Sequence, residues 1–96
     1  MNDPDVLQAL RAVIDPEIGI NIVDLGLVYR ATRNTEAIDV ALTLSTPTCP
    51  LGEMLLADAR ETLRARFANL EIHVELVWEP PWTPDRMSEA ARRLLR

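Results

Sequence analysis

Apolar and polar residues alternate most regularly across residues 37–46, and this period of two predicts a β-strand with one buried face. The same alternation across residues 70–78 predicts a further strand, in which Trp78 belongs to the buried set. Another strand is expected over residues 25–32, and the turn-forming residues 34–36 that follow it predict an antiparallel hairpin. The pattern therefore predicts three short strands, of which the first two along the chain are neighbours in a sheet.

Three other segments carry apolar residues at helical spacing. The first begins after Asp3, a suitable N-cap residue, and ends near Ile14, because Pro16 disfavours a helical conformation at the residue before it. The longest helix is expected over residues 51–68, and the last one begins with Thr83 as its cap. The apolar sides of these two helices are formed by Leu51, Leu55, Ala59, Leu63 and Phe67, and by Met87, Ala90, Ala91, Leu94 and Leu95.

The expected order of elements is α-β-β-α-β-α, within one domain that spans residues 1–96. A helix that connects two neighbouring strands usually makes them parallel, with a right-handed crossover. We therefore predict an α+β (two-layer α/β) fold with a small mixed sheet. In this topology the loops at residues 15–24, 46–49 and 79–82 converge at one end of the sheet, where ligand sites often lie.

Composition and charge narrow the range of functions. The 96 residues are 48% hydrophobic and 26% charged, as in a soluble globular domain. The net charge of -5 argues against binding to nucleic acid or to an anionic membrane surface. All ten basic residues are arginine, which excludes lysine Schiff-base chemistry and a P-loop lysine. No membrane span or signal peptide is evident and the single cysteine forms no internal disulfide, so a cytoplasmic location is expected.

Cys49 is the residue most suggestive of chemistry. It lies between Pro47 and Pro50, where a predicted strand meets the long predicted helix. The free N–H groups and the partial positive charge of a helix N-terminus favour a thiolate, which is a better metal ligand or nucleophile than a thiol. The alternative is a buried cysteine that packs as a small apolar residue. The position at a strand-to-helix junction favours the functional interpretation.

Polar residues on two loops are candidates for the same site. Asp15, Glu17 and Asp24 lie in or near the loop before the first strand, where they could hold a metal ion, orient a partner, or simply cap the backbone of a turn. Thr46 and Thr48 flank the cysteine, and their hydroxyls could hydrogen-bond the thiolate or cap the next helix. These five residues are the expected surroundings of a reactive thiol.

The segment after the last strand adds two candidates. Glu79 could face the site or the solvent, and Trp82 is either a hydrophobic staple or an exposed anchor for a partner. His73, the only histidine, is expected on the polar side of the strand and several residues from the loop end. A nucleophilic Cys–His pair needs hydrogen-bond contact, so this placement weakens the interpretation as a cysteine hydrolase.

Several motifs of known chemistry are absent from the sequence: a Gly-rich phosphate loop, a Cys-x-x-Cys pair and a His-Glu-x-x-His helix. With one cysteine, one subunit cannot supply the four thiolates of a typical iron–sulfur cluster. A cluster would need further ligands from a second subunit, a partner protein or a small thiol. It would then be exposed and labile.

Three segments resemble the motifs of the iron–sulfur cluster assembly domain family, which includes PaaD-like and SufT-like proteins and the N-terminal domain of some Mrp-type carriers. They are Asp-Pro-Glu-Ile-Gly-Ile-Asn-Ile-Val-Asp-Leu-Gly-Leu-Val-Tyr at 15–29, Thr-Pro-Thr-Cys-Pro at 46–50, and Pro-Pro-Trp-Thr-Pro-Asp-Arg-Met at 80–87. The extra C-terminal cysteines of PaaD, the ATPase of Mrp-type carriers and the N-terminal extension of many SufT-like proteins are missing. The sequence thus resembles the bare domain.

The resemblance implies an accessory factor in iron–sulfur cluster assembly or transfer, with Cys49 as a metal or cluster ligand or contact. Asp15, Glu17 and Asp24 match acidic positions of the family. The implied partners are the assembly machinery and client apo-proteins, and the implied cofactor is a labile cluster or iron shared within a homodimer or with a partner. A non-enzymatic role is favoured. The alternatives are an interaction adaptor without a cluster, with Trp82 as its anchor, and a thiol-dependent enzyme that uses Cys49.

Overall fold

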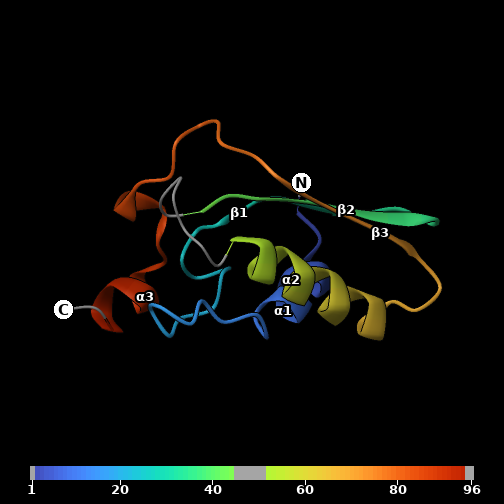
Figure 1. Ribbon diagram of the computed structural model, residues 1–96, viewed down its shortest axis with the longest axis horizontal. Helices are drawn as coiled ribbons and strands as arrows, with labels where there is room; N and C mark the ends of the chain where they lie inside the picture. Colours follow the sequence, from blue (N-terminus) through green and yellow to red (C-terminus); the bar gives the residue numbers. More distant parts are fainter. Residues whose placement is uncertain (1, 45–51, 95–96) are drawn as a thin grey trace.

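The computed structural model describes residues 2–44 and 52–94. They form two layers, as Figure 1 shows: a three-stranded sheet, and the helices α1 (Pro4–Leu10) and α2 (Gly52–Arg66) packed against one of its faces. Within the described residues no helix covers the other face of the sheet. The predicted two-layer α+β fold is confirmed.

The sheet has the strand order β1 (Val28–Arg33), β2 (Ala37–Leu42) and β3 (Glu71–Leu76). β1 and β2 form an antiparallel hairpin, and β2 and β3 are parallel and connected through α2. Both predicted pairings are confirmed. The start of β1 and the ends of β2 and β3 consequently lie at the same end of the sheet.

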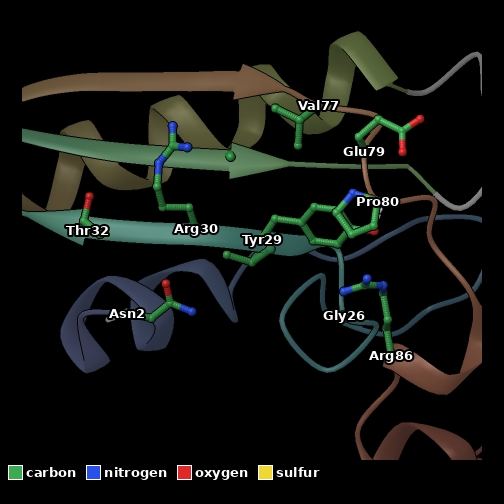
Figure 2. Close-up of a pocket in the computed structure, with 11 residues that line it drawn as sticks. Asn2, Gly26, Tyr29, Arg30, Thr32, Val77, Glu79, Pro80 and Arg86 are labelled. Atoms are coloured by element: carbon green, nitrogen blue, oxygen red, sulfur yellow. Dashed lines mark hydrogen bonds between the residues drawn. The ribbon is translucent and has the colours of Figure 1, made fainter.

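β1 contains one residue more than the stretch of β2 that it pairs with. Val28 lies opposite Leu42, whereas Arg30 lies opposite Ala41, so Tyr29 is the extra residue of a bulge. A bulge bends its strand and redirects a side chain. The Tyr29 ring extends past the strand and lies beside Pro80 in Figure 2.

The start of the chain is fixed by two sets of hydrogen bonds. Asp3 Oδ1 accepts from the backbone N–H groups of Asp5 (2.9 Å) and Val6 (3.1 Å), which confirms Asp3 as the N-cap of α1. The backbone N–H of Asp3 donates to the carbonyl of Ala31 (2.7 Å), and the N–H of Ala31 donates to Asn2 Oδ1 (2.9 Å). These bonds cover the free edge of β1 at its middle.

The core lies between the sheet and the two helices, and it includes side chains that the sequence pattern predicted to be buried on β2 and α2. Ile38 and Val40 are buried on β2, and Leu55, Ala59 and Leu63 are buried on α2. Ala41 and Thr43, which the pattern placed on the polar side of the strand, are buried as well. The loop between α1 and β1 contributes Ile20, Ile22, Leu25 and Leu27. No helix among the described residues is both long enough and apolar enough to cross a membrane.

Several predicted element ends are wrong. α1 stops at Leu10 and not near Ile14, which instead forms an isolated bridge with Asn21. Trp78 is 43% exposed, so its assignment to the core is also wrong. β3 ends two residues before Trp78, and the alternation of a strand no longer determines where that side chain points. β2 likewise ends earlier than predicted, at Leu42.

The predicted last helix is two elements in the structure: a 3₁₀ turn, η1 (Pro84–Arg86), and a short helix, α3 (Glu89–Leu94). Thr83 makes no side-chain capping bond, and Ser88 Oγ accepts from the N–H of Ala91 (3.1 Å). Thr83 is thus the N-cap residue of η1, with Pro84 at its first position as predicted, but the side-chain cap belongs to Ser88 at α3. The backbone N–H of Ser88 donates to the carbonyl of Asp24 and not to a carbonyl of η1. The helical hydrogen-bond pattern is therefore interrupted between the two elements.

Candidate functional site

The loop before β1 and the segment after β3 are in contact at one end of the sheet. The indole Nε1–H of half-buried Trp82 donates to the carbonyl of Leu25 (2.8 Å). The backbone N–H of Ser88 donates to the carbonyl of Asp24 (2.7 Å). Two of the three loops that were predicted to converge therefore do so. The contacts of Trp82 are those of a residue packed against the core, and its role as a partner anchor stays a prediction.

The third loop carries Cys49, which lies outside the described residues together with Thr46 and Thr48. Their roles stay predictions. The residues on either side of this segment are described, and they touch: a Cβ atom added to Gly52 would lie 2.7 Å from Cδ1 of Leu44. The two residues that border the Cys49 segment in the sequence are therefore in contact with each other, just beyond the carboxyl end of β2.

Asp15 organises the turn that opens the loop before β1. Its side chain is buried, and Oδ1 accepts from the backbone N–H of Glu17 (2.9 Å). Its carbonyl accepts from the N–H groups of Ile18 (3.3 Å) and Gly19 (2.7 Å), and Gly19 has the positive φ of 79° that closes the turn. This geometry is the backbone-capping role that was one of the three interpretations of Asp15. Glu17 is exposed, and a ligand role for either residue stays a prediction.

Asp24 is the centre of a joint between the end of α1, the loop and the start of α3. Its Oδ2 accepts from Asn21 Nδ2 (2.7 Å), and its Oδ1 accepts from Arg11 Nη1 (2.9 Å). The hydrogen bond from the Asn21 amide is the main cause that lowers the pKa of Asp24 from its ordinary value of 3.8. Partial burial opposes this shift, and Arg11 and Ser88 add to the lowering. Asp24 is therefore an ionised carboxylate whose two oxygens bind donors of this chain.

A groove of about 720 Å³ lies beside this joint, on the side of β1 shown in Figure 2. Residues from β1, from the segment after β3 and from η1 line it, among them Gly26, Tyr29, Arg30, Val77, Pro80 and Arg86. The Tyr29 hydroxyl donates to the carbonyl of Pro80 (2.7 Å), which closes one side of the groove. Glu79 lies at the rim, exposed, with its carboxylate directed away from the Tyr29 ring (Figure 2).

Arg86 is fixed at the lower side of the groove by its backbone and by its side chain. A Cβ atom on Gly26 would lie 2.2 Å from the carbonyl oxygen of Arg86, so the two backbones meet with no room for a side chain. The guanidinium carbon lies 4.6 Å from the centre of the Tyr29 ring. This distance is within the range of a cation–π contact.

Arg30, which lines the groove, forms an ion pair across the sheet. Arg30 on β1 and Glu75 on β3 both lie beside Ala41 of the central strand. Because Ala41 is small, Arg30 Nη2 reaches Glu75 Oε1 at 2.9 Å. The positive charge of Arg30 is therefore partly neutralised within the protein.

No group of three or more His, Cys, Asp or Glu side chains within the described residues could hold a metal ion. Asp15, Glu17 and Asp24 therefore form no metal site by themselves. His73 is exposed on the polar side of β3, as predicted, and Glu71 is 3.7 Å from it.

Sequence reasoning did not single out three residues that the structure brings to this end: Arg11, Tyr29 and Arg86. Tyr29 and Arg86 are inside two of the quoted motif segments, which was the signal that could have drawn attention to them. Their contact depends on a bulge in one strand and on a segment more than fifty positions away in the sequence. No local pattern contains that information.

Comparison with known proteins identifies one family. Residues 3–74 match the family described as "Iron-sulfur cluster assembly protein". The "Fe-S protein maturation auxiliary factor YitW" of Bacillus subtilis is 35% identical over 89 residues, which are 92% of this chain and 87% of that protein. The "Fe-S protein maturation auxiliary factor SufT" of Staphylococcus aureus is 43% identical over 82 residues, 83% of this chain and 92% of that protein.

A solved structure supports the same relation. The crystal structure of a domain of unknown function from Bacillus anthracis has a TM-score of 0.90 and 36% sequence identity. The match covers 95% of this chain and 88% of that one. Sequence and fold therefore agree over nearly the whole length.

Proposed function

Because the chain belongs to the iron–sulfur cluster assembly protein family, we propose that it is an auxiliary factor in the maturation of iron–sulfur proteins. It works in the cytoplasm without catalysing a reaction of its own. It brings a cluster, or the machinery that carries one, to client apo-proteins. The observation that carries the proposal is the similarity to named maturation factors over almost the full length of both chains.

We assign the contact with the cluster or metal to Cys49. It precedes Gly52, the first residue of α2, by three positions, and the N-terminal end of a helix favours a thiolate. One thiolate cannot hold a cluster, so the other ligands come from a client, an assembly protein or a second copy of the chain. In this proposal the cluster is a substrate that the protein transfers and does not keep. A single exchangeable ligand suits such a transfer.

The acidic residues divide into two groups in this proposal. Asp15 and Asp24 shape the end of the fold through hydrogen bonds to their own chain. Glu17 and Glu79 are exposed and can face a partner or a metal. Thr46 and Thr48 flank the thiolate as hydrogen-bond donors, and Trp82 presents its exposed part to the partner.

The test measures maturation directly. In a bacterial strain that lacks its own member of this family, the activity of an enzyme with a [4Fe–4S] cluster is measured after expression of this chain. We expect the wild type to restore the activity and Cys49→Ala to abolish the restoration. His73→Gln, which changes an exposed residue of β3, is the control and should restore the activity as the wild type does.

Anaerobic reconstitution with iron and sulfide distinguishes the mechanisms. A Cys49-dependent absorption band, with the mass of one or two chains, supports direct contact with the cluster. No band, together with restoration by Cys49→Ala, would support an adaptor and remove Cys49 from the mechanism. Failure of the wild type to restore the enzyme would overturn the proposed function, and turnover of a substrate that is lost in Cys49→Ala would favour a thiol-dependent enzyme.

A further inference from the structure

Arg86 has defined contacts in the groove, yet no carboxylate among the described residues neutralises its charge. Its carbonyl is packed against Gly26, and its guanidinium stacks on the ring of Tyr29 at 4.6 Å. The ring is itself fixed, because its hydroxyl donates to the carbonyl of Pro80. Three contacts thus fix the position of one cation.

Several other arginines are paired with carboxylates of this chain, and Arg60 and Arg92 donate to backbone carbonyls. Arg11, Arg30 and Arg33 each lie within 3.2 Å of a carboxylate oxygen of this chain. No carboxylate of the described residues pairs with Arg86, although acidic residues outnumber basic ones by 15 to 10. A stack on an aromatic ring uses the face of the guanidinium and leaves its N–H groups at the edge for a bidentate partner.

The rest of the groove suits an extended peptide chain. Val28, Val77 and Pro80 provide apolar surface, and Thr32 and Asn2 provide polar groups along β1. The groove is open along the side of the sheet that no helix covers in the described part of the chain (Figures 1 and 2). A segment that crosses it would pass Arg86 at one end and the ion pair of Arg30 with Glu75 further along.

We propose that this groove binds an extended acidic segment of a partner protein, with a Glu or Asp carboxylate on the N–H groups of Arg86. Charge complementarity selects the occupant, since Arg86 has no carboxylate partner among residues 2–44 and 52–94, while Arg30 is already paired with Glu75. Nucleic acid is a poor fit, because its closely spaced phosphates would all face a chain of net charge -5, whereas the proposed segment needs only one carboxylate at Arg86. This inference rests on the proposed function only for the partner's identity, which would be a client or an assembly protein.

The experiment uses a short peptide of alternating Glu and Gly residues with an amidated C-terminus, and the same peptide with Gln in place of Glu. Binding is followed by NMR through the backbone amides of Gly26, Thr32 and Val77, which line the groove. We expect the Glu peptide to shift these signals and to bind about tenfold more tightly than the Gln peptide, as for one charge-assisted hydrogen-bonded pair. Equal affinity of the two peptides would overturn the proposal.

Two charge-matched variants locate the site. Arg86→Gln should weaken the Glu peptide about tenfold and leave the Gln peptide unchanged. Arg64→Gln makes the same change of net charge at an exposed position of α2 that does not line the groove, and should have no effect. Equal losses in both variants would mean that only net charge matters, which contradicts a site at Arg86.

Further variants separate this inference from the proposed function. Tyr29→Leu keeps the charge of Arg86 but removes the ring beneath it, and should weaken the Glu peptide while a urea titration verifies that the protein is folded. Cys49→Ala should bind the peptide as the wild type does. If the wild type matures its client but Arg86→Gln does so equally well and no peptide shifts the groove signals, the groove proposal fails while the proposed function stands.

Discussion

The joint around Asp24 and the groove around Arg86 lie at the same end of the molecule, but they handle charge in different ways. In the joint, the carboxylate of Asp24 receives the guanidinium of Arg11 and the amide of Asn21. In the groove, the guanidinium of Arg86 stacks on Tyr29 and has no carboxylate partner among the described residues. A charged group that is paired within its own chain stabilises the fold. A charge positioned by an aromatic face is fixed in place but remains open to a ligand.

The two regions are physically connected, because Asp24, Gly26 and Tyr29 lie within six residues of the same loop and strand start. Asp24 accepts from the N–H of Ser88, and Gly26 packs against Arg86. The segment after β3 is therefore held against the loop at the last residue of η1 and again just after it. Changes at these positions can show how far the joint and the groove depend on each other.

Gly26→Ala is expected to have the largest effect on stability. The added Cβ would push the backbone of Arg86, which lines the groove, away from the loop that carries Asp24. Its Cβ would meet the Arg86 backbone at 2.2 Å, and φ at this position is 77°. We expect a loss of about 3 kcal/mol or more in the free energy of unfolding, measured by urea titration.

Gly19→Ala is the matched control for this substitution. Its φ is 79°, but nothing lies within 4 Å of the added Cβ. Only the backbone strain of about 1–2 kcal/mol remains in this variant. Equal losses in the two variants would show that the close contact with Arg86 contributes nothing.

Asp24→Asn is expected to have an intermediate effect, because it removes the charge of the joint and leaves the groove residues in place. We expect a loss of about 1–2 kcal/mol at pH 7, where the ionised carboxylate binds Arg11 and the Asn21 amide. The folded-state pKa of Asp24 is lowered below 3.8, so this stability is present above that pH and is lost as the pH falls through the folded-state value.

The measurement for Asp24 is urea unfolding of the wild type and of Asp24→Asn at pH 7 and at about pH 3. The difference in stability between the two proteins should shrink at the lower pH. Asp39→Asn, at an exposed position of β2, is the control and should stay close to the wild type at pH 7. A difference that does not change with pH would contradict the assignment of the lowered pKa to the joint.

Arg86→Gln is expected to have the smallest effect on stability. It tests most directly whether the charge of Arg86, unlike that of Asp24, contributes little to the fold. The guanidinium is exposed and its stack on Tyr29 contributes about 0.5–1 kcal/mol at most. Arg11→Gln, which leaves Asp24 without its cation, should cost at least as much. Thermal unfolding of the two variants tests the order. A larger loss in Arg86→Gln would make Arg86 a structural residue and would remove the physical basis of a groove ligand.

Local patterns determined much of the fold. The alternation on β2, the apolar stripe of α2 and the cap at Asp3 each depend on residues close together in sequence. The structure confirms the cap and, over the described residues, the stripe; on β2 the predicted buried side is confirmed, but Ala41 and Thr43 of the predicted polar side are buried as well. The order of elements then implied the hairpin and the parallel crossover, because few connections of such short elements are sterically favourable. The same argument correctly brought the loop before β1 and the segment after β3 to one end of the sheet.

The tertiary structure alone decided where these local patterns stop and which side chains meet. Trp78 is exposed because β3 ends at Leu76, and the last helix is divided where Ser88 bonds to Asp24. The partner of Arg86 is a ring that a strand bulge turns toward it. Hydrophobic period and capping report only on neighbours along the chain. The stack of Arg86 on Tyr29 forms between residues 57 positions apart, so it exists only once the whole fold has closed.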